Sequence, residues 1–149
     1  MNPKTSLSPA LQERDRRISA AAAPFAGRSR DPRYYGFFQC FNDRDFYEAH
    51  EVLESLWLGC RGTPAARFYQ GLIQLAGAFV HLQKQRPGPA AALFRLADAN
   101  LALYPPAHEG LDAVAVRGLI AEWLAKLGTL GAGDTRPLAE SVPVLMPGD

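Results

Sequence analysis

The fold is decided by residues 41–57, which read FNDRDFYEAHEVLESLW. Aromatic, imidazole and carboxylate side chains recur in this segment at the spacing of an α-helix. At about 100° per residue, one broad apolar face holds Phe46, Ala49, Leu53, Leu56 and Trp57. The pattern predicts an amphipathic helix whose apolar side packs into the core of the protein.

The ends and the outer face of this helix follow from the same segment. Asp45 is placed to cap the N-terminus, and Glu48 three residues later completes a pattern like a capping box. Glycines within residues 59–62 end the helix. The face opposite the apolar one carries Glu48, Glu51 and Ser55, which are expected to meet water.

The most informative pair in the helix is His50 and Glu54, four residues apart on the flank of the apolar face. Tyr47 and Trp57 border this pair. A buried polar group without a partner costs about 1–3 kcal/mol, so each of the two is expected to have one. Three alternatives follow: a hydrogen-bonded structural pair, a pair of metal ligands, or a base with its orienting partner.

A second, longer helix is predicted from Thr63 and Pro64 to about Gln85. The threonine supplies a capping hydroxyl, and proline is tolerated in the first turn of a helix. The widest apolar face of this helix holds Phe68, Leu72, Leu75, Phe79 and Leu82. Because the helix is apolar over most of its circumference, it is expected to be buried in the middle of the protein.

A narrow polar stripe interrupts this second helix and consists of Gln70, Gln74, Gly77 and His81. The stripe is either a thin strip that faces solvent or the inner wall of a polar pocket. In the second case, the amides of Gln70 and Gln74 are expected to bond to His50 and Glu54 across the interface between the two helices.

Three further helices are predicted, and they cover residues 33–41, 90–103 and 112–127. The inner edge of the middle one is expected to carry Leu93, Leu96 and Leu103. Residues 87–89, Pro-Gly-Pro, are expected to form the turn that precedes it. His108 is expected in a solvated loop, and Gly128 is expected to end the last helix.

Together these elements predict an all-α fold, a single-domain antiparallel helical bundle of about five helices in residues 32–128. Residues 1–31 are expected to form a flexible or partly helical basic arm. The Gly- and Pro-rich residues 129–149 are expected to be a mobile tail or an extended strap. With 149 residues, 48% of them hydrophobic, the chain has the length for one domain with one core.

Charge is unevenly distributed along the chain. The formal net charge is +1, but residues 1–33 hold seven Lys or Arg against three acids, whereas residues 34–149 hold nine against twelve. The basic arm does not interleave aromatic residues with its arginines, so it is expected to be solvated. Nucleic acid is therefore not an expected partner.

The two cysteines, Cys40 and Cys60, form neither a CxxC motif nor a zinc-finger spacing. They are expected to be reduced thiols that pack as small hydrophobic groups. The chain has no run of about 18 apolar residues and no apolar segment near its first residue. A soluble cytoplasmic protein without a membrane partner is expected.

Two motifs, FYEAHEVLESLW and FYQGLIQLAGAFVHLQ, give the chain a family resemblance over about residues 32–127. Together they resemble a family of small helical proteins known as domain of unknown function 309. The residues that carry the resemblance are Asn42, Ala49, His50, Glu51, Glu54, Trp57, Gly71, Leu72, Ile73, Gln74 and His81. The resemblance implies an all-α fold and implies no activity. Arg44 stands at a corner where that family usually has a small residue.

Two classes of function follow from these residues, and no catalytic residue is assigned. The first is a pocket between the two main helices that binds a small molecule, with the candidate residues Tyr47, His50, Glu54, Trp57, Gln70, Gln74 and His81. No cofactor is evident, but a divalent metal held by His50, Glu54 and His81 is one version of this hypothesis. The second is a non-enzymatic scaffold or protein-interaction module in which the same residues form a structural polar network. The small molecule, the protein partner and the oligomeric state are not specified by the sequence.

Overall fold

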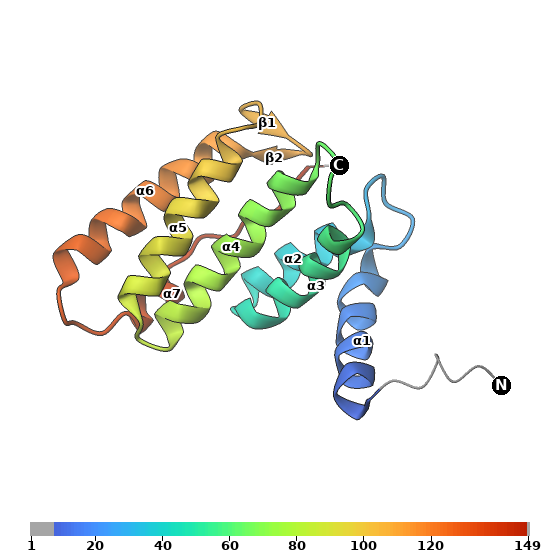
Figure 1. Cartoon of the computed structure of the whole chain (residues 1–149), viewed down its shortest axis with the longest axis horizontal. Helices are drawn as coiled ribbons and strands as arrows, with labels where there is room; N and C mark the ends of the chain where they lie inside the picture. Colours follow the sequence, from blue (N-terminus) through green and yellow to red (C-terminus); the bar gives the residue numbers. More distant parts are fainter. Residues whose placement is uncertain (1–7, 149) are drawn as a thin grey trace.

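The structure is a computed structural model that describes residues 8–148. The described residues form seven α-helices, one short 3-10 helix and one antiparallel pair of two-residue strands (Figure 1). In chain order the elements are α1 (Pro9–Ala22), η2 (Ala23–Phe25), α2 (Pro32–Asn42), α3 (Phe46–Leu58), α4 (Ala66–Gln83), α5 (Pro87–Leu101), β1 (Ala107–His108), β2 (Leu111–Asp112), α6 (Ala113–Leu130) and α7 (Arg136–Glu140). The all-α prediction is confirmed.

The number of helices is larger than the predicted five or so because the two ends of the chain also contain helices. Helix α1 lies in the segment that was expected to be an arm, and α7 lies in the segment that was expected to be a tail. Residues 1–7 of the predicted arm and residue 149 of the predicted tail lie outside the described residues.

Successive helices pack against one another in the order of the chain: α2 on α3, α3 on α4, α4 on α5, and α5 on α6. Figure 1 shows α4, α5 and α6 running side by side, with α2 and α3 beyond α4 and α1 at the edge next to them. Helix α4 is therefore the middle of the arrangement, as its wide apolar face predicts.

Phe79 on α4 is the centre of the core. It is fully buried, and its ring contacts four other aromatic rings at centroid distances of 4.7–5.4 Å. These rings belong to Phe41, Phe46, Phe94 and Trp123, which lie on α2, α3, α5 and α6. One side chain therefore joins the packing of five helices.

The predicted apolar face of α3 is confirmed, but the prediction for its outer face is partly wrong. Phe46, Ala49, Leu53 and Leu56 are buried. Glu51, which was expected to meet water, is only 7% exposed because α1 packs over that side of α3. Asp45 occupies the N-cap position, but its side chain makes no capping hydrogen bond, whereas Gly59 occupies the predicted C-cap.

The predicted starts of α4 and α5 are shifted. Helix α4 begins at Ala66 and not at Thr63, whose hydroxyl donates instead to the carbonyl oxygen of Cys60 at 2.6 Å. Residues 87–89 do not form a turn before α5 but its first turn, since proline fits the first positions of a helix.

The inner face of α5 also differs from the prediction. Leu96 and Leu103 are more than half exposed, and the buried positions are Ala90, Phe94, Ala97, Asn100 and Leu101. The prediction followed leucines, whereas small residues and one phenylalanine form the close contact with α4.

The segment after α5 corrects two further predictions. His108 is half-buried and not in a solvated loop, since its ring lies 4.7 Å from the Phe68 ring and 4.8 Å from the Tyr104 ring between centroids. Helix α6 is capped by Asp112 as predicted, but it continues past Gly128 to Leu130 and is followed by a left-handed Gly131.

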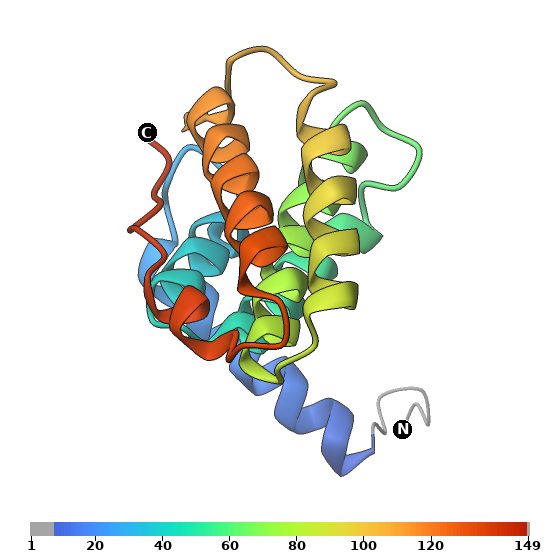
Figure 2. The same ribbon diagram turned by 90° about the vertical axis from the view of Figure 1, so that its left-hand side faces the viewer.

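Residues 141–148, here called the C-terminal strap, run back across the helices in an extended form. Figure 2 shows this segment in red beside α2. The side chain of Asn42 donates to the carbonyl oxygen of Leu145 at 2.8 Å and accepts from its amide at 2.9 Å. The Arg44 guanidinium donates to the carbonyl oxygen of Val142 at 2.9 Å. Residues 141–148 are therefore extended and hydrogen-bonded to residues 42–44.

The arginines of the predicted solvated arm are instead engaged within the protein. Carboxylates lie within ion-pair distance of Arg14, Arg16, Arg17, Arg30 and Arg33. The guanidinium of Arg28 lies 5.2 Å from the centroid of the Tyr35 ring. The charge of these arginines is therefore matched in part by carboxylates of the chain.

Both cysteines are free thiols, as predicted. Cys40 is buried in the core, and burial raises the pKa of its thiol to about 12, so it packs as a small hydrophobic group.

Among residues 8–148, none of the helices has the length and apolar character needed to cross a membrane.

Candidate functional site

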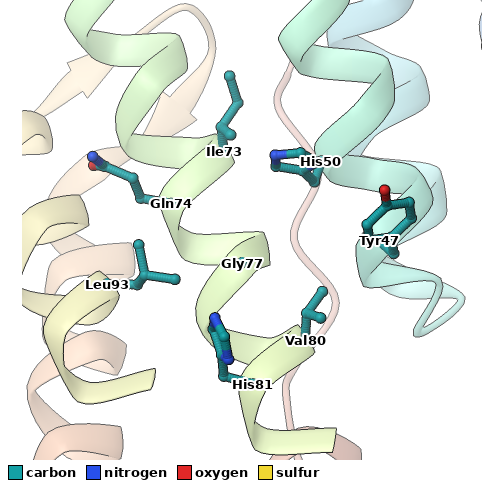
Figure 3. Close-up of a pocket in the computed structure, with 8 residues that line it drawn as sticks. All are labelled: Tyr47, His50, Ile73, Gln74, Gly77, Val80, His81 and Leu93. Atoms are coloured by element: carbon teal, nitrogen blue, oxygen red, sulfur yellow. The ribbon is translucent and has the colours of Figure 1, made fainter. Parts of the chain in front are cut away.

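A pocket of about 330 Å³ opens between α3 and α4, and α5 closes one side of it. This volume is at the lower end of the range of about 300–1,000 Å³ that small-molecule sites occupy. The residues that line it are Tyr47, His50, Ile73, Gln74, Gly77, Val80, His81 and Leu93 (Figure 3). The lining is mostly apolar, and its polar groups are two histidines, one glutamine and the hydroxyl of Tyr47.

The structure brings four of the seven predicted site residues to this pocket, namely Tyr47, His50, Gln74 and His81. Glu54, Trp57 and Gln70 do not line it. Glu54 lies behind His50, and Trp57 lies near the end of α3 under the guanidinium of Arg61. The polar stripe of α4 is therefore in part the wall of a pocket.

Sequence reasoning did not assign Ile73, Val80 and Leu93 to the site, and it named Gly77 only as a member of the polar stripe of α4. Gly77 carries a signal that could have found it, because a glycine inside a helix costs about 0.5–1 kcal/mol relative to alanine. A Cβ atom at Gly77 would lie 3.1 Å from Cδ1 of Leu93. The missing side chain thus keeps space between α4 and α5.

His50 projects from α3 toward α4 (Figure 3). Its Nε2 lies 3.3 Å from Oε2 of Glu54, one helical turn away, and the two side chains are 32% and 33% exposed. Its Nδ1 is buried and has no hydrogen-bond partner among the described residues. A carboxylate oxygen beside Nε2 favours a proton on that nitrogen, so the neutral imidazole presents Nδ1 as an acceptor.

Gln74 does not make the predicted contact with His50 and Glu54. Its Oε1 accepts a hydrogen bond of 2.8 Å from Nδ2 of Asn100, a buried residue of α5. Figure 3 shows the amide of Gln74 directed away from His50. The glutamine therefore links α4 to α5 at the edge of the pocket.

His81 is the second imidazole in the pocket wall. Burial is the main cause that lowers its pKa, and the positive charges of Arg86 and Lys84 lower it further. The ring is therefore neutral at pH 7 and offers one donor and one acceptor. Its Nδ1 is also buried without a hydrogen-bond partner in residues 8–148.

The predicted metal set of His50, Glu54 and His81 does not come together as a group. Within the described part of the chain, no three or more His, Cys, Asp or Glu side chains gather in a way that could hold a metal ion. Only the contact between His50 and Glu54 is formed.

Comparison with known proteins finds a family match for the part of the chain that contains the pocket. Residues 34–93 match the family described as Domain of unknown function (DUF309). These residues are similar to that family over less than half of the chain. The matched segment begins in α2 and ends in α5, and every residue that lines the pocket falls inside it.

The DUF309 match is accompanied by one curated relative, an uncharacterized protein of Aquifex aeolicus (strain VF5). The two chains are 28% identical over 102 residues, which is 68% of this chain and 30% of the relative. The chain thus spans less than a third of the length of the relative that it matches. No solved structure matches the chain, and neither the family description nor the relative's name states an activity.

Proposed function

We propose that the pocket between α3 and α4 binds a small molecule that has an apolar body and a hydroxyl group. One observation carries this proposal: two imidazole nitrogens, Nδ1 of His50 and Nδ1 of His81, are buried without partners on residues that line the same pocket. Buried polar atoms are nearly always hydrogen-bonded, and an unsatisfied one costs about 1–3 kcal/mol. A ligand that bonds to these nitrogens would recover part of that free energy.

The polar chemistry of the ligand follows from Glu54. Because Glu54 favours the proton on Nε2 of His50, Nδ1 presents a lone pair and needs a donor. A hydroxyl can donate to this lone pair of His50. A carboxylate would instead place its charge against the lone pair of His50.

The apolar body of the ligand follows from the rest of the wall. Ile73, Val80 and Leu93 present hydrocarbon side chains, and Gly77 leaves space beside them. Tyr47, which is 59% exposed, places its ring at the outer edge of the pocket, 5.8 Å from the His50 ring between centroids. Burial of apolar ligand surface against such groups contributes about 25 cal/mol per Å².

Three matched probes test the proposal: p-cresol, toluene and benzoate, titrated into the ¹⁵N-labelled protein. We expect p-cresol to shift the amide resonance of Gly77 with millimolar affinity, about −4 kcal/mol. Toluene lacks the hydroxyl and is expected to bind about two- to tenfold more weakly, because one hydrogen bond contributes about 0.5–1.5 kcal/mol. The amide of Gly118 in α6 serves as the control and should not move.

Two outcomes of this titration would contradict the proposal. One is the absence of any shift at Gly77 and His81 with all three probes. The other is equal binding of p-cresol and toluene in both the wild-type protein and the His50→Ala variant, which would remove any role for the imidazole.

The second candidate function is a scaffold in which the same residues lock helices together. It is favoured by the bond between Gln74 and Asn100, which ties α4 to α5, and by the contact of Glu54 with His50. In that case His50 and Glu54 contribute to stability and no ligand is needed.

Stability measurements on His50→Ala and Glu54→Gln separate the two functions. Because both side chains are about one-third exposed, solvent screening keeps their contact weak. We expect each substitution to lower the free energy of unfolding in urea by less than about 1 kcal/mol. Glu122→Gln, at an exposed position of α6, is the matched control. Losses of several kcal/mol in either variant would favour the scaffold.

A further inference from the structure

Helix α1 is attached to α3 mainly through charge. None of its residues is fully buried, yet it covers the carboxylate of Glu51. Nη2 of Arg17 donates to both oxygens of Glu51, at 3.0 and 3.1 Å. This contact explains why an acid on the outer face of α3 is removed from water.

Arg14 extends this contact toward the pocket. Its Nε lies 3.9 Å from Oε2 of Glu51, and its Nη2 lies 3.6 Å from Oε1 of Glu54. The other oxygen of Glu54, Oε2, lies 3.3 Å from Nε2 of His50. The carboxylate of Glu54 therefore faces α1 with one oxygen and the pocket histidine with the other.

Helix α1 also packs against α2. Ile18 and Ala21 are partly buried against the core. The backbone of α1 comes close to α2 at Gly36, where a Cβ atom would lie 2.8 Å from the carbonyl oxygen of Ala21. Because the helix has little buried apolar surface and its ion pairs are partly exposed, it belongs to the parts of a protein that open most easily.

We propose that Arg14 is a positioning residue for the pocket: docked α1 holds Glu54 against Nε2 of His50 and thereby keeps Nδ1 of His50 as an acceptor. When α1 undocks, Glu54 loses its partner on that side and is free to turn away, so the proton of the imidazole is no longer held on Nε2. The effect of α1 on ligand binding rests on the proposed function, whereas its effect on the tautomer of His50 does not.

The coupling works in both directions. If docked α1 favours the imidazole form that binds a hydroxyl, then a hydroxyl compound in the pocket must favour docked α1 by the same factor. Occupancy of the pocket is thereby transmitted to α1, which lies on the other side of Glu54.

The test reads the tautomer of His50 directly and needs no ligand. Long-range ¹H–¹⁵N spectra of the full chain, labelled at histidine nitrogens, distinguish the two neutral forms of the ring. We expect the wild-type protein to hold the proton on Nε2. Arg14→Gln is expected to lower the ratio of the two tautomers about two- to fivefold, in keeping with a partly exposed ion pair. Arg14→Lys should restore it.

Arg16→Gln is the matched control, because Arg16 lies on the same helix but pairs with Glu13 at 2.6 Å and not with α3. It should leave the tautomer ratio unchanged. Glu54→Gln should change the ratio as Arg14→Gln does, and it provides a second variant if the first is poorly folded. Amide hydrogen exchange of α1 should become faster in Arg14→Gln and remain unchanged in Glu122→Gln.

The proposal is overturned if Arg14→Gln accelerates exchange in α1 while the tautomer ratio of His50 stays at the wild-type value. It is equally overturned if Arg16→Gln alters the ratio as much as Arg14→Gln does. Failure of p-cresol to bind would contradict the proposed ligand and leave these ring measurements intact, so the two proposals fail separately.

Discussion

Replacing Phe79 with alanine is expected to lower the free energy of unfolding by about 3–5 kcal/mol. The side chain is fully buried and packs against aromatic rings from four other helices. Its removal leaves a cavity that those rings cannot fill without leaving their own contacts. Urea unfolding followed by tryptophan fluorescence measures the loss, and Trp123, whose ring centroid lies 4.7 Å from that of Phe79, is a local reporter.

Leu96→Ala is the control for this substitution. Leu96 lies on α5 but is 51% exposed, so its truncation should change the free energy of unfolding by about 0.5 kcal/mol or less. A loss of less than about 1 kcal/mol in Phe79→Ala, or equal losses in both variants, would mean that Phe79 is not at the centre of the core.

Replacing Gly71 with valine is expected to lower the free energy of unfolding by about 1–3 kcal/mol. Gly71 lies where α4 and α5 come closest. A Cβ atom there would lie 3.1 Å from Cβ of Asn100 and 3.3 Å from the carbonyl oxygen of Ala97. The two helices must separate to accept the side chain, and this movement also strains the bond between Asn100 and Gln74. Thermal and urea unfolding both measure the effect.

Gly118→Ala is the control, and it is expected to raise the free energy of unfolding because Gly118 lies in a helix with open space beside it. Apart from its chain neighbours and the backbone of its own helix, no atom of residues 8–148 lies within 4 Å of the position of its Cβ, so alanine should stabilise α6 by about 0.5–1 kcal/mol. If Gly71→Val were also stabilising, the gain in helix propensity would exceed the cost of separating the helices, and the close contact would not be essential to the fold.

The parts of the fold that were predicted correctly are those with a strong helical period. The apolar faces of α3 and α4 repeat over three or more turns, and every residue predicted on the widest face of α4 is buried. The inner face of α5 was predicted wrongly from its leucines. Leu96 on α5 and Leu103 just after it are exposed, and mainly small residues of α5 form the contact with α4. Residue type alone does not show which face a neighbouring helix will cover.

The candidate site likewise has residues that could be predicted from the sequence and contacts that could not. His50, Gln74 and His81 could be predicted because they interrupt apolar patterns on two helices. The partners of Glu51 and Glu54 could not, since Arg14 and Arg17 lie about 35 residues earlier, in a segment whose charge suggested a solvated arm. A projection of one helix contains no information on what a distant segment places over it.

At Arg44, side-chain hydrogen bonds compensate for a strained backbone conformation. Its φ of 68° is the left-handed conformation that favours a small residue, as the resemblance to domain of unknown function 309 leads one to expect. Here the long side chain donates to backbone carbonyl oxygens of Asn42, Glu140 and Val142. These bonds offset the backbone strain and hold the C-terminal strap.

The contacts between Asn42 and Leu145 join positions 103 residues apart in the chain. During synthesis on a ribosome, α2 and α3 emerge long before Leu145 does, so the amide of Asn42 has only water as its partner in that interval. Closing such a long loop is entropically slow compared with forming neighbouring helices. A nascent chain would therefore be able to pack Phe41, Phe46 and Phe79 together before Leu145 emerges and completes the α2–α3 corner.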